Sequence, residues 1–224
     1  MKQLKNYLSI LSMLLLLLTF ASCTSNTENV HEYVDLGLPS GIKWATCNVG
    51  ANSPEDYGDY FAWGETEPKD YYDWSTYKYF NGSYDTMTKY FTDSDYGTVD
   101  NKTTLELTDD AAHVNWGGNW RMPTKAEQDE LRNTDNCTWE WTTLNGVEGY
   151  KVISKKNGNS IFLPAAGYRY DDSLHYAGSY GLYWSSSLNT SSGYYAYRLS
   201  FGSDYVGCYY RYRYLGQSVR PVCE

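Results

Sequence analysis

Apolar and polar residues alternate over several short stretches of the chain, which is the pattern of β-strands. Residues 42–51 alternate in this way, and a shorter run at residues 33–41 ends in the turn sequence Pro39-Ser40-Gly41. Together they predict an opening β-hairpin, because successive side chains of a strand point to opposite faces. Further runs, separated by the turn sequences Asn145-Gly146 and Gly158-Asn159, predict a meander of strands at residues 139–143, 149–154 and 160–164.

Helical signals are confined to two short segments. Thr124-Lys125-Ala126-Glu127 is a capping box, in which the Thr and Glu side chains satisfy free backbone N–H groups, and it predicts a helix to about Arg132. A second short helix is expected to begin within residues 107–116, with Asp109 as its N-cap. Residues 68–100 have no clear period, which favours long ordered loops. The chain is therefore predicted to be a β-rich α+β domain with one or two short helices and long loops.

The first 22 residues have the pattern of a signal peptide. Lys2 and Lys5 precede an almost wholly apolar run over residues 8–20, which is too short for a comfortable membrane span. Ala21-Ser22-Cys23 follows, and a cysteine directly after small residues resembles the bacterial lipobox. That resemblance implies cleavage before Cys23 and attachment of lipid to it. The alternative is an ordinary secreted protein in which Cys23 has no such role.

The rest of the chain is expected to divide into a short polar tether at residues 23–31, which is flexible, and one domain at residues 32–224. The residue after Cys23 is Thr24, and the absence of Asp there favours the outer membrane of the bacterial envelope, with exposure at the cell surface left open. The net charge of −9 argues against a nucleic-acid partner, because phosphate contacts require Lys and Arg. Aromatic residues make up 17% of the chain, which argues against disorder.

The chemistry expected of cysteine, histidine and acidic side chains is limited. Export permits disulfides, and Cys47 and Cys223 would bridge if the terminal strands pair, whereas in the alternative these two, Cys137 and Cys208 are all free. With three histidines and no C-x-x-C sequence, neither a zinc site nor another cofactor is expected. The acidic residues of segment 93–100 (Asp93, Asp95 and Asp100) lack EF-hand spacing, so a solvated acidic loop is favoured over a calcium loop.

The most unusual composition lies in residues 166–222. About half of the chain's 25 tyrosines fall here, among Ser, Gly, Asp and Arg, and Lys is absent. This is the composition of an antibody combining site, where Tyr supplies large contact area at low entropic cost. Over residues 197–201 the period of two places Tyr197, Leu199 and Phe201 on one face and Arg198 and Ser200 on the other. We therefore expect the first set to face the core and the second to face solvent.

Six sequence blocks occur in an order that resembles the Fibrobacter succinogenes major paralogous domain (FISUMP). The blocks begin at residues 33, 44, 116, 163, 183 and 217 and read YVDLGLPSG, WATCNVGA, WGGNWRMPT, LPAAGYR, YWSSS and QSVRPV. The family is similar to C-type lectin-like folds and to the formylglycine-generating enzyme scaffold, so the resemblance implies that fold. Formylglycine-generating activity needs redox cysteines in its active site, and neither Cys208 nor Cys223 has a recognisable reactive context. No enzyme is therefore predicted.

The last part of the chain also resembles the variable region of a diversity-generating retroelement target protein. In such systems, adenine-directed errors turn template Asn codons into Tyr, Ser, Asp, Gly, His, Cys, Leu or Arg. The resemblance implies a diversified surface that binds an unknown protein or glycan. The alternative is a lectin-like or adhesin module of fixed specificity. The candidate ligand-binding residues drawn from that set are Tyr170, Asp171, His175, Tyr176, Tyr180, Leu182, Tyr194, Tyr195, Arg198, Ser200, Asp204, Tyr205, Cys208, Tyr209, Tyr210, Tyr212 and Leu215.

Overall fold

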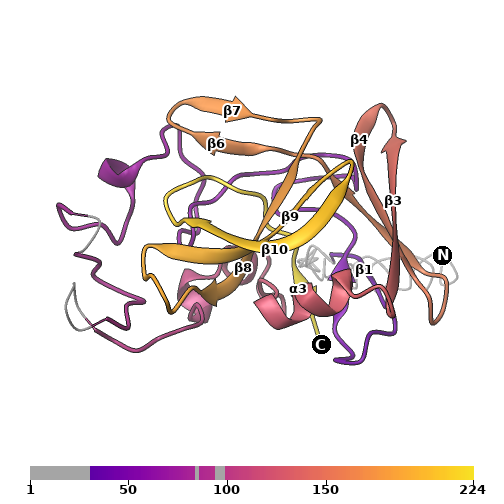
Figure 1. Ribbon diagram of the computed structural model, residues 1–224, viewed down its shortest axis with the longest axis horizontal. Helices are drawn as coiled ribbons and strands as arrows, with labels where there is room; N and C mark the ends of the chain where they lie inside the picture. The colour runs from indigo at the N-terminus through magenta and orange to yellow at the C-terminus, as the bar shows by residue number, and fades with distance from the viewer. Residues whose placement is uncertain (1–30, 84–85, 94–98) are drawn as a thin grey trace, which may run out of the picture. The chain divides into compact units, whose positions relative to one another are not determined.

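A computed structural model describes residues 31–83, 86–93 and 99–224 of the chain. In this part the protein is β-rich, with small antiparallel sheets, two short α-helices and long connecting segments (Figure 1). This confirms the predicted α+β class. The predicted signal peptide, the lipidation site Cys23 and most of the predicted tether lie outside the described residues. No helix of the described part is long and apolar enough to cross a lipid bilayer.

The two ends of the domain meet in one sheet. β1 (Tyr33–Val34) pairs with β2 (Lys43–Ala45), and β2 also pairs with β11 (Val222–Cys223). The terminal strands therefore pair, but the register places Cys223 opposite Lys43, four residues from Cys47. The predicted alternative of a Cys47–Cys223 bridge is not formed, and both thiols are free.

His31 belongs to the folded domain and not to the tether in which it was expected. Its ring stacks on Trp116 with a centroid distance of 3.7 Å and an interplanar angle of 5°, and it meets Trp120 edge-on. Burial against these rings lowers the pKa of His31. The domain therefore begins at least one residue before the predicted boundary.

The predicted meander is confirmed as a sheet of β3 (Cys137–Leu144), β4 (Val147–Ser154) and β5 (Ser160–Pro164). Asn145 and Gly146, which connect β3 to β4, have φ angles of 48° and 86°. Two positive φ values in succession are what a type I′ hairpin turn requires, and Asn-Gly adopts them more readily than other pairs.

The central sheet contains β8 (Gly181–Leu188), β9 (Tyr195–Gly202) and β10 (Tyr205–Tyr212), with β9 in the middle. Neighbouring side chains of β8 and β9 enter two different cores because they point to opposite faces of the sheet. Trp184, Leu188 and Ala196 join a cluster that includes Phe61 and Trp63. The second cluster, which includes Leu131 and Val152, receives Tyr183, Leu199 and Phe201.

Helix α3 (Lys125–Arg132) begins at the predicted capping box. Thr124 Oγ1 accepts the Glu127 N–H, and a Glu127 carboxylate oxygen accepts the Thr124 N–H at 2.7 Å. Glu127 also pairs with Arg121. Gln128 on the buried side of α3 donates to the carbonyls of Tyr183 and Trp184 on β8, which ties the helix to the central sheet.

Helix α2 (Ala111–Trp116) is present, but its N-cap is Asp110 and not Asp109 as predicted. Asp110 Oδ1 accepts the N–H groups of Ala112 and His113. Asp109 ends a preceding 3₁₀ turn (Leu107–Asp109) and contacts Lys78 and Lys89 instead. A second 3₁₀ turn covers Trp74–Thr76. Two adjacent aspartates give the same capping signal in sequence, so the pattern did not distinguish them.

Candidate ligand-binding surface

A short hairpin carries the first group of candidate residues. β6 (Tyr168–Tyr170) and β7 (Ser173–His175) pair around a turn at Asp171, whose φ is 50°. The Asp171 backbone exchanges hydrogen bonds of 2.9 and 3.0 Å with Tyr72, which is fully buried. Figure 1 shows this hairpin at the top of the molecule, above β9 and β10. The rigid attachment to a core residue fixes the position of the tyrosines on it.

Gly167 fixes the direction in which the chain enters that hairpin. Its φ is 66°, and a Cβ atom there would lie 2.1 Å from the carbonyl oxygen of His175. No L-residue side chain fits such an approach. Gly167 lies in the sequence block LPAAGYR, and the structure gives a physical reason for a glycine at this position.

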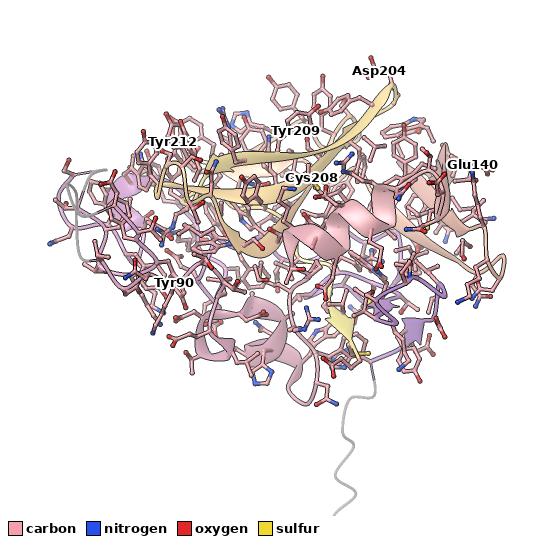
Figure 2. The ribbon with its side chains drawn as sticks, turned by 60° about the horizontal axis from the view of Figure 1, so that its bottom comes forward. Tyr90, Glu140, Asp204, Cys208, Tyr209 and Tyr212 are labelled. Atoms are coloured by element: carbon pink, nitrogen blue, oxygen red, sulfur yellow. The ribbon has the colours of Figure 1, made fainter. Side chains whose placement is uncertain are left out.

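β10 carries the second group and is an edge strand of the central sheet. Tyr209 and Tyr210 are 51% and 53% exposed. Figure 2 shows Tyr209 and Cys208 on opposite sides of β10, with Cys208 on the side of α3. Burial, together with a hydrogen bond to Asp129, raises the pKa of the Cys208 thiol to about 12. Cys208 is therefore a half-buried thiol that is less acidic than an ordinary cysteine.

The candidate tyrosines of both groups are joined by ring contacts into one continuous set, which we call the tyrosine network. Adjacent rings in it have centroid distances of 4.7 to 6.4 Å. Large exposed hydrophobic side chains concentrate here, since six of the eleven in the described part lie within residues 166–222. The members of the network are Tyr168, Tyr170, His175, Tyr176, Tyr180, Tyr194, Tyr195, Tyr197, Tyr205, Tyr209, Tyr210, Tyr212 and Tyr214.

Some network members were not among the predicted candidates. Tyr168 had been assigned to a scaffold block, and Tyr197 to the core face of its strand. Tyr214 connects the two groups, because its ring lies 6.1 Å from Tyr170 and 5.6 Å from Tyr212. Trp74, from a distant loop, packs against Tyr212 and Tyr214. The first three are visible in sequence as tyrosines of the same segment, whereas Trp74 carries no such signal.

Three predicted candidates are not on the surface. Leu182, Ser200 and Leu215 are exposed by only 4%, 2% and 3%. The expectation that Ser200 faces solvent was wrong because β9 is the central strand, and Ser200 lies opposite Leu182 on β8 and Gly207 on β10. Both faces of β9 are covered at this level, so a period of two does not separate core from solvent. Leu182, Ser200 and Leu215 are therefore removed from the candidate surface.

The charged residues of the surface are sparse. Asp204 is exposed at the tip of the β9–β10 hairpin (Figure 2). Arg211 is exposed on β10, and its guanidinium lies 5.6 Å from the centroid of the Tyr212 ring. Arg198 is partly exposed, although its Nε is buried. Burial and the nearby Arg211 lower the pKa of Arg198 to about 10, so it keeps its charge at neutral pH.

The candidate calcium loop is only partly described, because Asp95 lies outside the described residues. Asp100 accepts the backbone N–H groups of Tyr90 and Phe91 at 2.9 and 3.0 Å, which accounts for its carboxylate as a structural group. Within the described ranges, no three His, Cys, Asp or Glu side chains are grouped so as to hold a metal ion.

Comparison with known proteins gives one family match. Residues 148–222 match the model of a "Domain of unknown function (DUF8237)", and this range contains all of β4 except its first residue, β5 to β10 and the whole tyrosine network. No curated protein matches the chain. No solved structure matches it either.

Proposed function

We propose that this protein is a lipid-anchored ligand-binding protein of the bacterial cell envelope, held at the outer membrane through Cys23, and that it binds a protein or glycan through the tyrosine network. We further propose that residues of this network are diversified between variants, as in the target proteins of diversity-generating retroelements. The observation that carries the proposal is the joining of exposed tyrosines from two hairpins into one network, beside strand residues that fill the cores.

The proposed fold is C-type lectin-like, in the FISUMP family. Six ordered sequence blocks support this assignment, and the β-rich α+β architecture with two short helices is compatible with it. Gly167, Trp184 and Val219, which belong to those blocks or adjoin them, are all buried. A scaffold of buried residues is what a protein with a changeable surface requires.

Because surface and core residues are separated, the surface residues can change with little loss in the free energy of unfolding. Tyr170, Tyr176 and Tyr180 are 39%, 56% and 36% exposed, comparable to the two exposed tyrosines of β10. Exposed substitutions usually change the free energy of unfolding by no more than about 0.5 kcal/mol, whereas core substitutions cost several. Tyr rings at such positions provide apolar contact area and hydroxyl groups to a partner.

A displayed library tests whether the surface accepts diversity. We expect random replacement of Tyr170, Tyr176, Tyr180, Tyr209 and Tyr210 to leave most clones folded, and selection against an arbitrary protein such as lysozyme to yield specific binders. A matched library at the buried positions Leu182, Leu199, Phe201, Leu215 and Val219 should abolish folding. Equal loss of folding in the two libraries would contradict the proposal.

The alternative function is a lectin-like or adhesin module with one fixed ligand. Tyrosine rings also stack on sugars, so the composition of the network is compatible with it. It predicts that variants from related strains keep the same network residues, whereas the diversified surface predicts that they differ at these positions.

A further inference from the structure

Two arginines on the strands that carry the tyrosine network have no acidic partner. Arg198 lies opposite Tyr209, and Arg211 lies opposite Ala196, so the two arginines are diagonal neighbours on one face of the β9–β10 pair. Neither forms an ion pair with an Asp or Glu of the described residues. The other arginines of residues 166–222 form no ion pair with a described residue either, but Arg198 and Arg211 lie side by side in a chain of net charge −9.

The fully buried arginines of the segment make more hydrogen bonds, although Arg220 Nη2 is also a buried donor without an acceptor among the described residues. Arg213 donates to the Tyr77 hydroxyl at 2.7 Å and to three backbone carbonyls. Arg220 donates to Asn48 Oδ1 at 2.8 Å and to two carbonyls. Arg198 has a single hydrogen bond to a described residue, from Nη1 to Gln217 Oε1 at 3.3 Å, and its Nε is buried without an acceptor. Its role is therefore not the cross-linking of loops.

Gln217 extends this group of free donors. It is fully buried, and its Nε2 also has no acceptor among the described residues. The amide orientation is fixed, because a flipped Gln217 would place its NH₂ group against the Arg198 guanidinium. Nearby, the hydroxyls of Ser200 and Tyr205 lie 3.4 Å apart. The site thus offers a positive charge and several donors but no negative group.

We propose that Arg198, positioned by Gln217, binds a carboxylate of the ligand, and that the ligand of this variant is a protein surface that presents Asp, Glu or a free C-terminus at this point. The inference rests on the proposed function of the tyrosine network. Guanidinium groups bind carboxylates through charge-assisted hydrogen bonds, and low local dielectric strengthens them. Tyr and Arg are the residues that dominate protein–protein hot spots, which favours a protein over an acidic sugar.

The net charge of the chain does not oppose this assignment. At physiological ionic strength, charges separated by more than about 8 Å are largely screened. The ligand carboxylate therefore responds mainly to Arg198 and to its diagonal neighbour Arg211.

The test is an NMR titration of the full mature domain with ¹⁵N-labelled arginine, using acetate as the probe at constant ionic strength. We expect acetate to shift the Arg198 Nε–Hε signal with saturation, and acetamide to have no such effect. Gln217→Glu should abolish the acetate response, because it supplies a carboxylate to Arg198 internally. Lys151→Gln, an exposed substitution on β4 with the same charge change, should leave it intact. A chemical-shift change that rises linearly with acetate, or an unchanged acetate response in Gln217→Glu, would contradict a carboxylate site at Arg198.

A second titration separates the two sources of a carboxylate. An end-blocked hexapeptide with one Glu is compared with galacturonic acid, which also carries one carboxylate. We expect half-saturation at a lower concentration of the peptide, and the reverse order would overturn the assignment to a protein ligand. The library experiment on the exposed tyrosines does not involve Arg198, so failure of the carboxylate site and failure of the binding surface are distinguishable.

Discussion

Arginine side chains in the last third of the chain act in different ways according to their partners. The Arg213 guanidinium lies 4.8 Å from the centroid of the Trp63 ring, and its donors bind the loop at residues 89–90 and the carbonyl of Gly193. Sequence analysis does not reveal this network, because it depends on carbonyls from distant segments. Arg198 keeps one buried donor, Nε, without an acceptor among the described residues, which is costly for the free protein.

We therefore predict opposite effects of the same substitution at the two sites. Arg213→Met should lower the free energy of unfolding by about 3 kcal/mol, because it leaves buried carbonyls and the Tyr77 hydroxyl without donors. Arg198→Met should raise it by about 1 kcal/mol, because it removes a poorly partnered, partly buried charge. Urea denaturation measures both. A loss of stability in Arg198→Met as large as in Arg213→Met would show that Arg198 is a structural residue.

Asp109 should control much of the acid sensitivity of the fold. Burial by itself would raise its pKa, but hydrogen bonds from Lys89, Tyr90 and Lys78 outweigh burial and hold the pKa well below its usual range. A carboxyl whose pKa is lower in the folded than in the unfolded state stabilises the fold above about pH 4. This stabilisation is lost as the pH falls further, towards the folded pKa.

The corresponding measurement is the free energy of unfolding between pH 7 and pH 2. We predict a steep decrease below about pH 4 in the wild type and a shallower one in Asp109→Asn, which is less stable at pH 7 but has no carboxyl to protonate at this position. The exposed variant Asp204→Asn serves as the control and should follow the wild type. Identical slopes for Asp109→Asn and the wild type would contradict the role given to Asp109.

At the scale of elements, the β9–β10 hairpin combines two kinds of strand. β9 is covered on both faces from Leu199 to Gly202, whereas β10 is at the edge of the sheet and exposes Tyr209 to Arg211. Diversity within this hairpin is therefore tolerated mainly on β10.

Serine substitutions test this difference between the two strands. Leu199→Ser on β9 should lower the free energy of unfolding by about 3 kcal/mol or more, because Leu199 is 1% exposed. Tyr209→Ser and Tyr210→Ser on β10 should each change it by no more than about 0.5 kcal/mol. Thermal or urea denaturation of the three variants decides the matter. A decrease of several kcal/mol in the free energy of unfolding of Tyr209→Ser would show that Tyr209 stabilises the fold and does not belong to the changeable surface.

The elements best predicted from sequence were those with local signals. The capping box at Thr124 and the Asn145-Gly146 turn are encoded within a few residues, and both are present as predicted. The sequence did not predict the β6–β7 hairpin, because its short strands depend on pairing with the distant residues Tyr72 and Gly216. The burial of Ser200 was missed for a similar reason, since neighbouring strands and loops decide which face of β9 is covered.

At the scale of the molecule, the central sheet lies between two hydrophobic cores. The two ends of the domain pair in a separate sheet of β1, β2 and β11. The same segment, residues 166–222, supplies side chains to both cores and carries the tyrosine network. The family match at residues 148–222 spans this segment. This arrangement allows a surface to change while the segment that bears it stays folded.

The central claim, a diversified binding surface on a fixed frame, is tested most directly by sequencing this gene in closely related strains. The account predicts that substitutions concentrate at the exposed network positions Tyr170, Tyr176, Tyr180, Tyr209 and Tyr210, and at Arg198 and Asp204. Gly167, Trp184, Leu199, Phe201 and Val219 should stay constant. Substitutions spread evenly over residues 32–224, or network residues that are identical in all strains, would contradict it.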